Sequence, residues 1–228
     1  LNHPELIQEC LVTRHRDFHK DKYYRFLALG LGKGLLTSED DFHLRQRRMI
    51  QPVFHKERIQ GYGETMARYA AEAAGKWQDG QQVDMMQEMN FLTLAIVGKT
   101  LFNSDVTAEA AMISRNIENF MHRDVFFMPP GGPLLFKLPW PFFRKFHRGR
   151  AEIDGVMFRM IDEHRASGDQ GDLLSMLLSA QDEDDGTGMT DLQVRDEAIT
   201  LFLAGHETTA NLLAQGLRRF AGGIAGQP

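Results

Sequence analysis

A long apolar helix between residues 190 and 217 constrains the fold of this chain most strongly. Thr190 and Gln193 have the Thr-x-x-Gln spacing of a capping box, which predicts a helix N-terminus. Asp191 and Asp196 lie in its first turns, where negative charge favours a helix. The apolar residues that follow cover nearly all sides of the helix: Ala198, Ile199, Phe202, Leu203, Leu212 and Leu213. Such a helix must be buried on most sides.

The middle of this helix, Ala204 to Thr209, reads Ala-Gly-His-Glu-Thr-Thr, which is a poor choice for a plain buried helix. Gly costs about 1 kcal/mol relative to Ala in a helix, and a Thr side chain that bonds to a carbonyl one turn earlier can bend it. Burying the Glu207 carboxylate costs more unless it has a partner. We therefore predict a locally opened helix with room for a flat ligand or a diatomic molecule. A carboxylate and a hydroxyl beside it could pass protons.

Helical periodicity also dominates the rest of the chain. Apolar residues recur every three or four positions, which predicts helices over 58–77, 83–102, 110–127, 144–166 and 172–180. No run of alternating apolar and polar residues is long enough to indicate a strand. The sequence therefore predicts a mainly α fold.

Composition excludes several classes of protein. The 228 residues are 43% apolar and 25% charged, with a net charge of -5, which excludes a collagen-like, disordered or nucleic-acid-seeking chain. The single cysteine, Cys10, excludes a disulfide framework and a Cys-rich zinc site, and favours a cytoplasmic location. No apolar stretch reaches the roughly 18 residues that suggest a membrane-spanning helix. Because the chain begins with Leu1 rather than Met, nothing follows about a preceding anchor.

Prolines and large apolar residues gather in one segment, which predicts an apolar loop over about 128–143. Such a loop packs over a core or covers an apolar entrance. The basic residues at 144–150 are expected to form a solvated helix face, and the acidic run at 182–185 an exposed turn.

Three competing motifs fail on inspection. His206-Glu207 begins a zincin pattern, but Ala210 stands where the second His is required. The segment 98–100 ends like a phosphate-binding loop, but Thr93 replaces its first Gly. The segment 30–32 begins like a dinucleotide fingerprint, but Leu35 replaces the third Gly.

A second group of candidate residues lies in the basic run 41–54. On a helix, His43 and Arg47 are one turn apart and share a face. Two such donors can hold a carboxylate or a phosphate, Arg47 through its planar fork. The alternative is a basic helix face that only contacts solvent.

The two segments together resemble the cytochrome P450 family. Ala204 to Thr209 matches the family's oxygen-binding I-helix motif, A/G-G-x-D/E-T-T, at every position. The run from His43 to Phe54 resembles the C helix, in which a Trp or His four residues before an Arg contacts the haem propionates. The apolar loop falls where the F–G loop covers the substrate channel. The resemblance spans roughly 18–213 and implies a P450-like helical fold in a single partial domain over 1–228.

The resemblance also assigns boundaries and roles. The C-helix region would span about 39–55 and the I helix about 191–217. Thr208 would hydrogen-bond dioxygen and direct a proton to it, and Glu207 would be the acidic partner in proton delivery. Ala204 and Gly205 would leave the groove for dioxygen over the haem. His43 and Arg47 would bind the haem propionates.

The family pattern includes parts that this sequence lacks. The thiolate ligand is a Cys in a Phe-x-x-Gly-x-x-x-Cys-x-Gly loop beyond the I helix, and neither this loop nor the K-helix Glu-x-x-Arg follows residue 217. Cys10 precedes the C helix and matches no ligand motif. We therefore assign no metal ligand in this chain and expect the axial Cys in a missing C-terminal half. Residues 218–228 are expected to be a non-native or truncated tail.

The function that the resemblance implies is a monooxygenase that inserts one oxygen atom from O2 into a lipophilic substrate. Its cofactor would be haem b (iron protoporphyrin IX). Electrons would come from NAD(P)H through a redox partner, a ferredoxin or a flavoprotein reductase. The chain as given is expected to be an incomplete and inactive part of it. The alternatives are a non-catalytic helical remnant and a helical module that binds lipophilic ligands.

Overall fold

A computed structural model describes residues 2–104, 106, 108–109, 112–113, 115–116, 141–182 and 184–225. Their helices, in chain order, are α1 (Pro4–Gln8), η1 (Glu9–Thr13), η2 (His15–Asp17), α2 (Lys22–Leu31), α3 (Asp40–Ile50), η3 (Gln51–Phe54), α4 (Lys56–Ala74), α5 (Met85–Phe102), α8 (Pro141–Ser167), α9 (Leu173–Ser179) and α10 (Asp191–Ala225). These ranges contain no strand, only an isolated bridge between Gln181 and Gly188. The prediction of a mainly α fold is confirmed.

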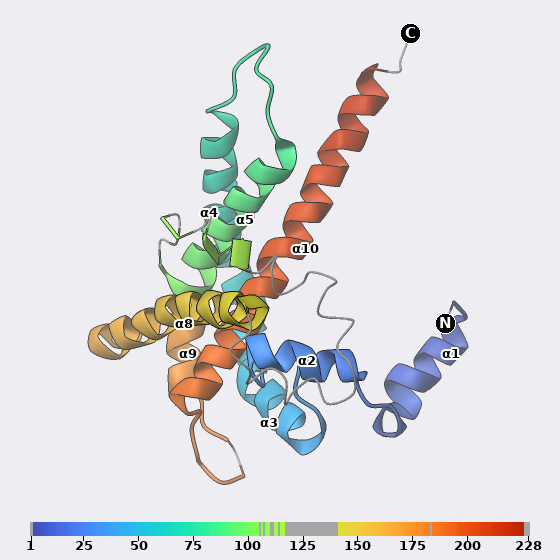
Figure 1. Cartoon of the computed structure of the whole chain (residues 1–228), viewed down its shortest axis with the longest axis vertical. Coiled ribbons are helices and arrows are strands. Elements are labelled where there is room, and N and C mark those ends of the chain that lie inside the picture. Colours follow the sequence, from blue (N-terminus) through green and yellow to red (C-terminus); the bar gives the residue numbers. More distant parts are fainter. Residues whose placement is uncertain are drawn as a thin grey trace.

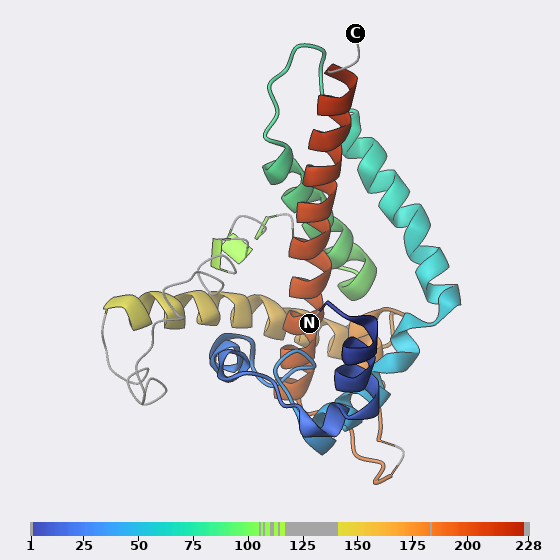
Figure 2. The same cartoon turned by 90° about the vertical axis from the view of Figure 1, so that its right-hand side faces the viewer.

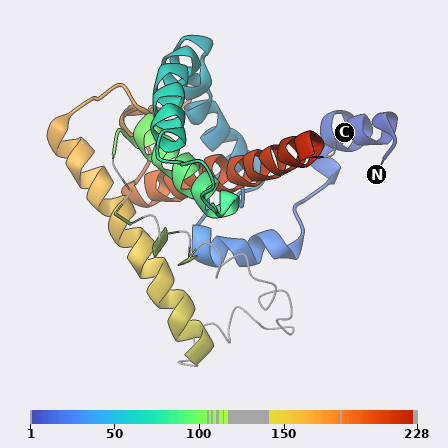
Figure 3. The same cartoon turned by 90° about the horizontal axis from the view of Figure 1, so that it is seen from above.

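The helix α10 forms the long axis of the fold. Figures 1 and 2 show α5 running beside it and α8 crossing it, and Figure 3 shows that α10 extends well past α8. The first half of α10 is buried, and its apolar side chains join one core with residues of α2, α5, α8 and α9. In the second half, Ala210 and Ala214 are buried beside Met89 of α5, whereas Leu212 is 72% exposed. The expected burial on most sides therefore holds only for the first half.

The start of α10 follows the capping box. The Thr190 backbone N–H donates to Gln193 Oε1 over 2.8 Å, and the Gln193 N–H donates to Thr190 Oγ1 over 3.3 Å. The helix then runs without interruption through 204–209, so the expected local opening is absent. It also continues to Ala225, past the expected end at about 217, although residues 215–221 are exposed. Once a helix is formed, each further residue adds a hydrogen bond without needing a tertiary contact.

The helices α4, α5, α8 and α9 agree with the predicted ranges to within three residues at each end, and α3 lies within the expected C-helix region of about 39–55. The helices α1 and α2 were not predicted. Most of the predicted helix over 110–127 lies outside the described residues, and so does the predicted loop up to residue 140. Residues 141–143 belong to the first turn of α8, not to this loop. Proline suits that first turn, because its missing N–H would have no partner there. No helix in the described part of the chain is long and apolar enough to cross a membrane.

The acidic run between α9 and α10 is only partly the exposed turn that its charge predicts. Asp184 and Asp185 are exposed, but Asp182 is 5% exposed. Arg45 of α3 donates through Nε to Asp182 Oδ2 over 2.9 Å, and this ion pair draws the carboxylate into the structure. Backbone and arginine hydrogen bonds lower the pKa of Asp182.

Candidate functional site

One face of α10 changes from buried to open along the helix. Glu197, Leu201, Ala204 and Thr208 follow one another at spacings of four, three and four, so they share this face, which we call the α10 stripe. Glu197 is fully buried and Leu201 is partly buried, whereas Ala204 and Thr208 are exposed. The open part of the stripe therefore presents a methyl group and a hydroxyl.

The Thr208 side chain is held in one orientation. Its Oγ1 donates to the Ala204 carbonyl over 2.6 Å, which leaves the lone pairs of the hydroxyl oxygen for another partner. Glu207, the preceding residue, is half-buried on the neighbouring face. Burial raises the pKa of Tyr23 in α2, and Tyr24 and the Glu207 carboxylate raise it further. Glu207 and Thr208 are consecutive residues, so the carboxylate and the hydroxyl lie on adjacent faces of α10.

Gly205 and His206 face α5 instead. A Cβ atom on Gly205 would lie 2.9 Å from Val97 Cγ2, so the glycine allows the two helices to approach closely. His206 is 3% exposed, and its ring stacks on Phe202 with 6.4 Å between centroids. Neither ring nitrogen makes a hydrogen bond of normal geometry with the described residues. Burial lowers the pKa of His206, although the nearby backbone of Asn90 opposes this change.

Replacing His206 with Phe should stabilise the chain, and more at pH 5 than at pH 8. In the unfolded chain His206 has its ordinary pKa of about 6.5, whereas burial lowers this pKa in the folded chain. As the pH falls through about 6.5 the unfolded state binds a proton first, so the folded state loses stability. Phe keeps the ring and removes two unsatisfied nitrogens, so we expect a gain of about 1–2 kcal/mol at pH 5. Urea unfolding at both pH values measures it. Equal effects at pH 5 and pH 8 would contradict the assignment of a neutral, buried His206.

The helix α3 carries His43 and Arg47. His43 is partly buried, and its Nδ1 lies 3.4 Å from Ser38 Oγ. Burial lowers its pKa, and the charges of Lys20 and Arg47 lower it further, while the backbone of Leu35 opposes them. The Arg47 side chain is exposed and has no hydrogen bond or ion pair within the described ranges.

The neighbouring arginines are engaged elsewhere. Arg45 holds Asp182, and Arg48 donates through Nη2 to Asp184 Oδ2 over 3.0 Å. The basic run is therefore not uniformly a solvated face. Arg47 and His43 remain as the pair that can bind an anion.

The helix α3 is attached to the buried end of the α10 stripe. Gln46 Nε2 donates to Glu197 Oε1 over 3.1 Å, and the Leu35 backbone N–H donates to Glu197 Oε2 over 2.9 Å. Thr208 lies eleven residues further along the stripe, about 16 Å along the helix axis. The helix that carries His43 and Arg47 and the helix that carries the open hydroxyl face thus meet at Glu197.

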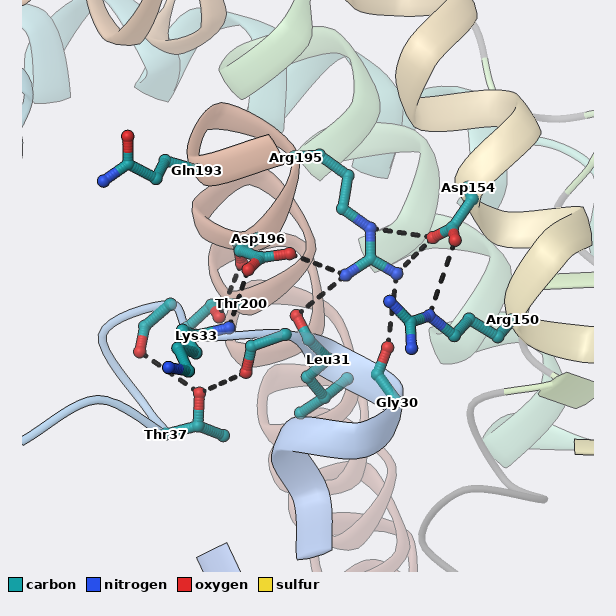
Figure 4. A network of polar contacts seen from close by, with 12 residues as sticks. Gly30, Leu31, Lys33, Thr37, Arg150, Asp154, Gln193, Arg195, Asp196 and Thr200 are labelled. Carbon is teal, nitrogen blue, oxygen red and sulfur yellow. Dashed lines mark hydrogen bonds and ion pairs between the residues drawn. The ribbon is translucent and has the colours of Figure 1, made fainter. Parts of the chain in front are cut away.

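A buried guanidinium joins α2, α8 and α10 (Figure 4). Arg195 is fully buried and donates through Nε to Asp154 Oδ1 over 2.7 Å and through Nη1 to Asp196 Oδ1 over 2.7 Å. Its remaining donors reach the carbonyls of Leu31 over 3.1 Å and Gly30 over 3.2 Å. Sequence reasoning missed this network. The signal was present, because Arg195, Asp196 and Glu197 are three consecutive charged residues directly before an apolar stretch that a sequence reading already expects to be buried.

Glycines allow the segment after α2 to lie directly on α10. Gly32 has a φ of 81°, and a Cβ atom there would lie 2.0 Å from Asp196 Oδ1. A Cβ atom on Gly34 would lie 2.6 Å from the Asp196 carbonyl oxygen. The Lys33 backbone N–H between them donates to Asp196 Oδ2 over 2.7 Å.

The residues of this site suit a flat apolar ring that carries carboxylates. The open part of the α10 stripe has no large side chain at Ala204, and His43 and Arg47 supply donors for the carboxylates. The described residues contain no group of three His, Cys, Asp or Glu side chains that could hold a metal ion. Cys10 lies in η1, among exposed residues. The chemistry of the residues present therefore fits the distal side and the propionates of a haem.

Comparisons with known proteins agree with this geometry. The chain is 36% identical to cyclooctatin synthase of Streptomyces melanosporofaciens over 92% of this chain and 47% of that protein. It is also 36% identical to cyclooctat-9-en-7-ol 5-monooxygenase of the same organism, over 93% of this chain and 46% of that protein. Pentalenene oxygenase of Streptomyces avermitilis is 32% identical, over 92% of this chain and 47% of that protein.

The chain thus spans about half the length of the curated relatives it matches. The family model for cytochrome P450 matches residues 1–221, which is nearly the whole chain. The chain belongs to the cytochrome P450 family.

Proposed function

We propose that this chain forms the distal, oxygen-side part of a haem-dependent monooxygenase that inserts one oxygen atom from O2 into a lipophilic substrate. The observation that carries the proposal is the attachment of α3, with His43 and Arg47, to the same face of α10 that presents Ala204 and Thr208. Bound haem b would supply the oxygen chemistry, with electrons from NAD(P)H through a ferredoxin or a flavoprotein reductase.

The residues of the chain would hold the cofactor and move a proton. Arg47 and His43 would bind the propionates by charge-assisted hydrogen bonds, and the lowered pKa of His43 makes Arg47 the main cation. The Thr208 hydroxyl carries one hydrogen, which it donates to the Ala204 carbonyl. To deliver a proton, the hydroxyl would release this hydrogen bond, give its own hydrogen to O2 and take a proton relayed from Glu207. Ala204 keeps the groove open.

The apolar cavity between α2, α8 and α10, lined mainly by Leu31, Met157, Ile199, Phe202 and Leu203, has a volume of only about 10 Å³. This is room for about one water molecule, so the lipophilic class of the substrate rests on the family resemblance and not on this cavity. The names of two relatives, a 5-monooxygenase and an oxygenase, support oxygen insertion as the reaction class.

Replacing Thr208 with Ala should uncouple dioxygen consumption from product formation. The experiment uses a chimera in which this chain replaces the matching 47% of cyclooctatin synthase. Loss of a positioned proton donor typically costs 10²–10⁴-fold in the step that it serves, so we expect product per O2 consumed to fall at least tenfold. The matched control is Thr209→Ala, the adjacent exposed threonine. Equal coupling in both variants would remove Thr208 from the mechanism.

One observation favours the alternative of a non-catalytic helical remnant. Large apolar side chains of α10 are exposed in the described structure, namely Leu212 at 72% and Phe220 at 70%. Such a surface is typical of a protein that lacks a partner for this face. Haem binding by such a remnant would not depend on His43 and Arg47, which separates this alternative from the monooxygenase.

A further inference from the structure

The carboxylate of Glu197 has no part in the proposed oxygen chemistry, yet it is fully buried. Burying a carboxylate is costly unless both oxygens have partners. Glu197 Oε1 accepts from Gln46 of α3 over 3.1 Å, and Oε2 accepts from the Leu35 backbone N–H over 2.9 Å. One side chain of α10 therefore holds both α3 and the segment that leads into it.

The contact with Gln46 fixes the rotation of α3. Gln46 is fully buried, and on the same short helix it directly precedes Arg47 and lies three residues after His43. A helix held by one inward side chain cannot turn about its axis without moving the side chains on its neighbouring faces. The Gln46–Glu197 hydrogen bond therefore sets the direction in which His43 and Arg47 point.

A second route runs from Glu197 to His43 through the segment before α3. The Leu35 carbonyl accepts from Lys20 Nζ over 3.0 Å, and the same ammonium donates to the Ser38 carbonyl over 2.6 Å. Ser38 Oγ in turn lies 3.4 Å from His43 Nδ1. Both routes start at one carboxylate and end on the face of α3 that carries the anion-binding pair.

We propose that Glu197 is a positioning residue that fixes the orientation of α3, and with it His43 and Arg47, relative to the open part of the α10 stripe. The proposal deepens the proposed function and rests on it for the identity of the bound anion. The positioning itself is a property of this chain that can be measured without haem.

Several charged groups face Glu197 from the elements packed around it. The pKa of Glu197 is raised to about 7, mainly by burial and in part by Asp196 on the same helix, against the opposing effects of the Leu35 N–H, Gln46 and Lys20. Arg195 pairs with Asp196 and weakens its effect. Gln46 Oε1 is buried with no hydrogen-bond partner. A Gln at position 197 could still accept from the Leu35 N–H and could also donate to this oxygen.

The test compares Glu197→Ala and Glu197→Gln in this chain by amide hydrogen exchange at pH 6. We expect Glu197→Ala to lower the protection of residues 33–50 at least tenfold relative to α5. Glu197→Gln should keep this protection, because it can still accept from the Leu35 N–H and can bond to Gln46 in the reverse direction. NMR titration should show the His43 pKa moving toward its ordinary value in Glu197→Ala only.

Two further variants keep the test decisive. Ile161→Ala, a buried apolar truncation in α8, controls for general destabilisation and should not single out residues 33–50. If Glu197→Ala does not fold, Gln46→Leu removes one of the two contacts and should lower protection in α3 selectively. Uniform loss of protection in Glu197→Ala, or none in residues 33–50, would overturn the positioning role.

The haem readout distinguishes this proposal from the proposed function. In the chimera that keeps His43 and Arg47, Glu197→Ala should weaken haem binding about tenfold. In the chimera with both residues replaced by Ala, Glu197→Ala should have little added effect. If removing His43 and Arg47 leaves haem affinity unchanged, the proposed function fails, while the exchange result still decides the positioning role. If haem affinity depends on His43 and Arg47 but exchange in residues 33–50 does not respond to Glu197, only the positioning role fails.

Discussion

Replacing Arg195 with Met should lower the free energy of unfolding by about 3–5 kcal/mol. Arg195 is fully buried and holds the carboxylates of Asp154 and Asp196 and the carbonyls of Gly30 and Leu31. Met fills much of the same volume but leaves two carboxylates, the buried one of Asp196 and the partly buried one of Asp154, without this cation. Three helices lose their common anchor, and urea unfolding followed by circular dichroism measures the loss.

The matched control for this prediction is Arg148→Met. Arg148 forms an i,i+4 ion pair with Glu152 on the surface of α8, and its side chain is 83% exposed. Exposed pairs of this kind contribute at most about 1 kcal/mol. Similar losses in the two variants would mean that the Arg195 network contributes no more than a surface ion pair.

Replacing Gly32 with Ala should destabilise the chain by at least about 3 kcal/mol, because two independent costs add. The backbone at Gly32 has a φ of 81°, which side-chain-bearing residues rarely adopt, and the new Cβ atom would lie 2.0 Å from Asp196 Oδ1. The Asp196 carboxylate would have to leave the Lys33 N–H or the Arg195 guanidinium. Thermal and urea unfolding both measure the effect.

Gly63→Ala is the control for this second prediction. Gly63 lies within α4, and a Cβ atom there would have no neighbour within 4 Å. Alanine favours a helix over glycine by up to about 1 kcal/mol, so this variant should be slightly more stable than the parent. A Gly32→Ala variant as stable as Gly63→Ala would show that the segment after α2 does not lie on Asp196 as described.

Local patterns in the sequence predict the helices well. The three-and-four spacing of apolar residues finds α4, α5, α8 and α9, and the capping box places the start of α10. These features depend on hydrogen bonds and side-chain faces within a few residues, which a sequence displays directly. The expectation of an opened helix at 204–209 was wrong, because Thr208 bonds to the Ala204 carbonyl inside an intact helix.

Contacts between distant residues could not be predicted in this way. Gln46 and Glu197 are 151 positions apart, and Arg195 is 164 positions from the Leu31 carbonyl it holds. The position of Asp182 in an acidic run predicts an exposed side chain, yet it is buried in an ion pair with the partly buried Arg45, 137 positions earlier. The motif residues Ala204 and Thr208 were recognisable, but Glu197 acquires its significance only once α3 is seen to pack against it.

The most direct test of the whole account is haem binding by the chimera in which this chain replaces the matching part of cyclooctatin synthase. Haem content and the carbon-monoxide difference spectrum of the reduced protein are measured with His43 and Arg47 present and with both replaced by Ala. We predict a thiolate-type Soret band in the parent chimera and at least a tenfold lower haem affinity in the double variant. Haem binding that does not change on removal of His43 and Arg47 would contradict the assignment of α3 and α10 to one haem site.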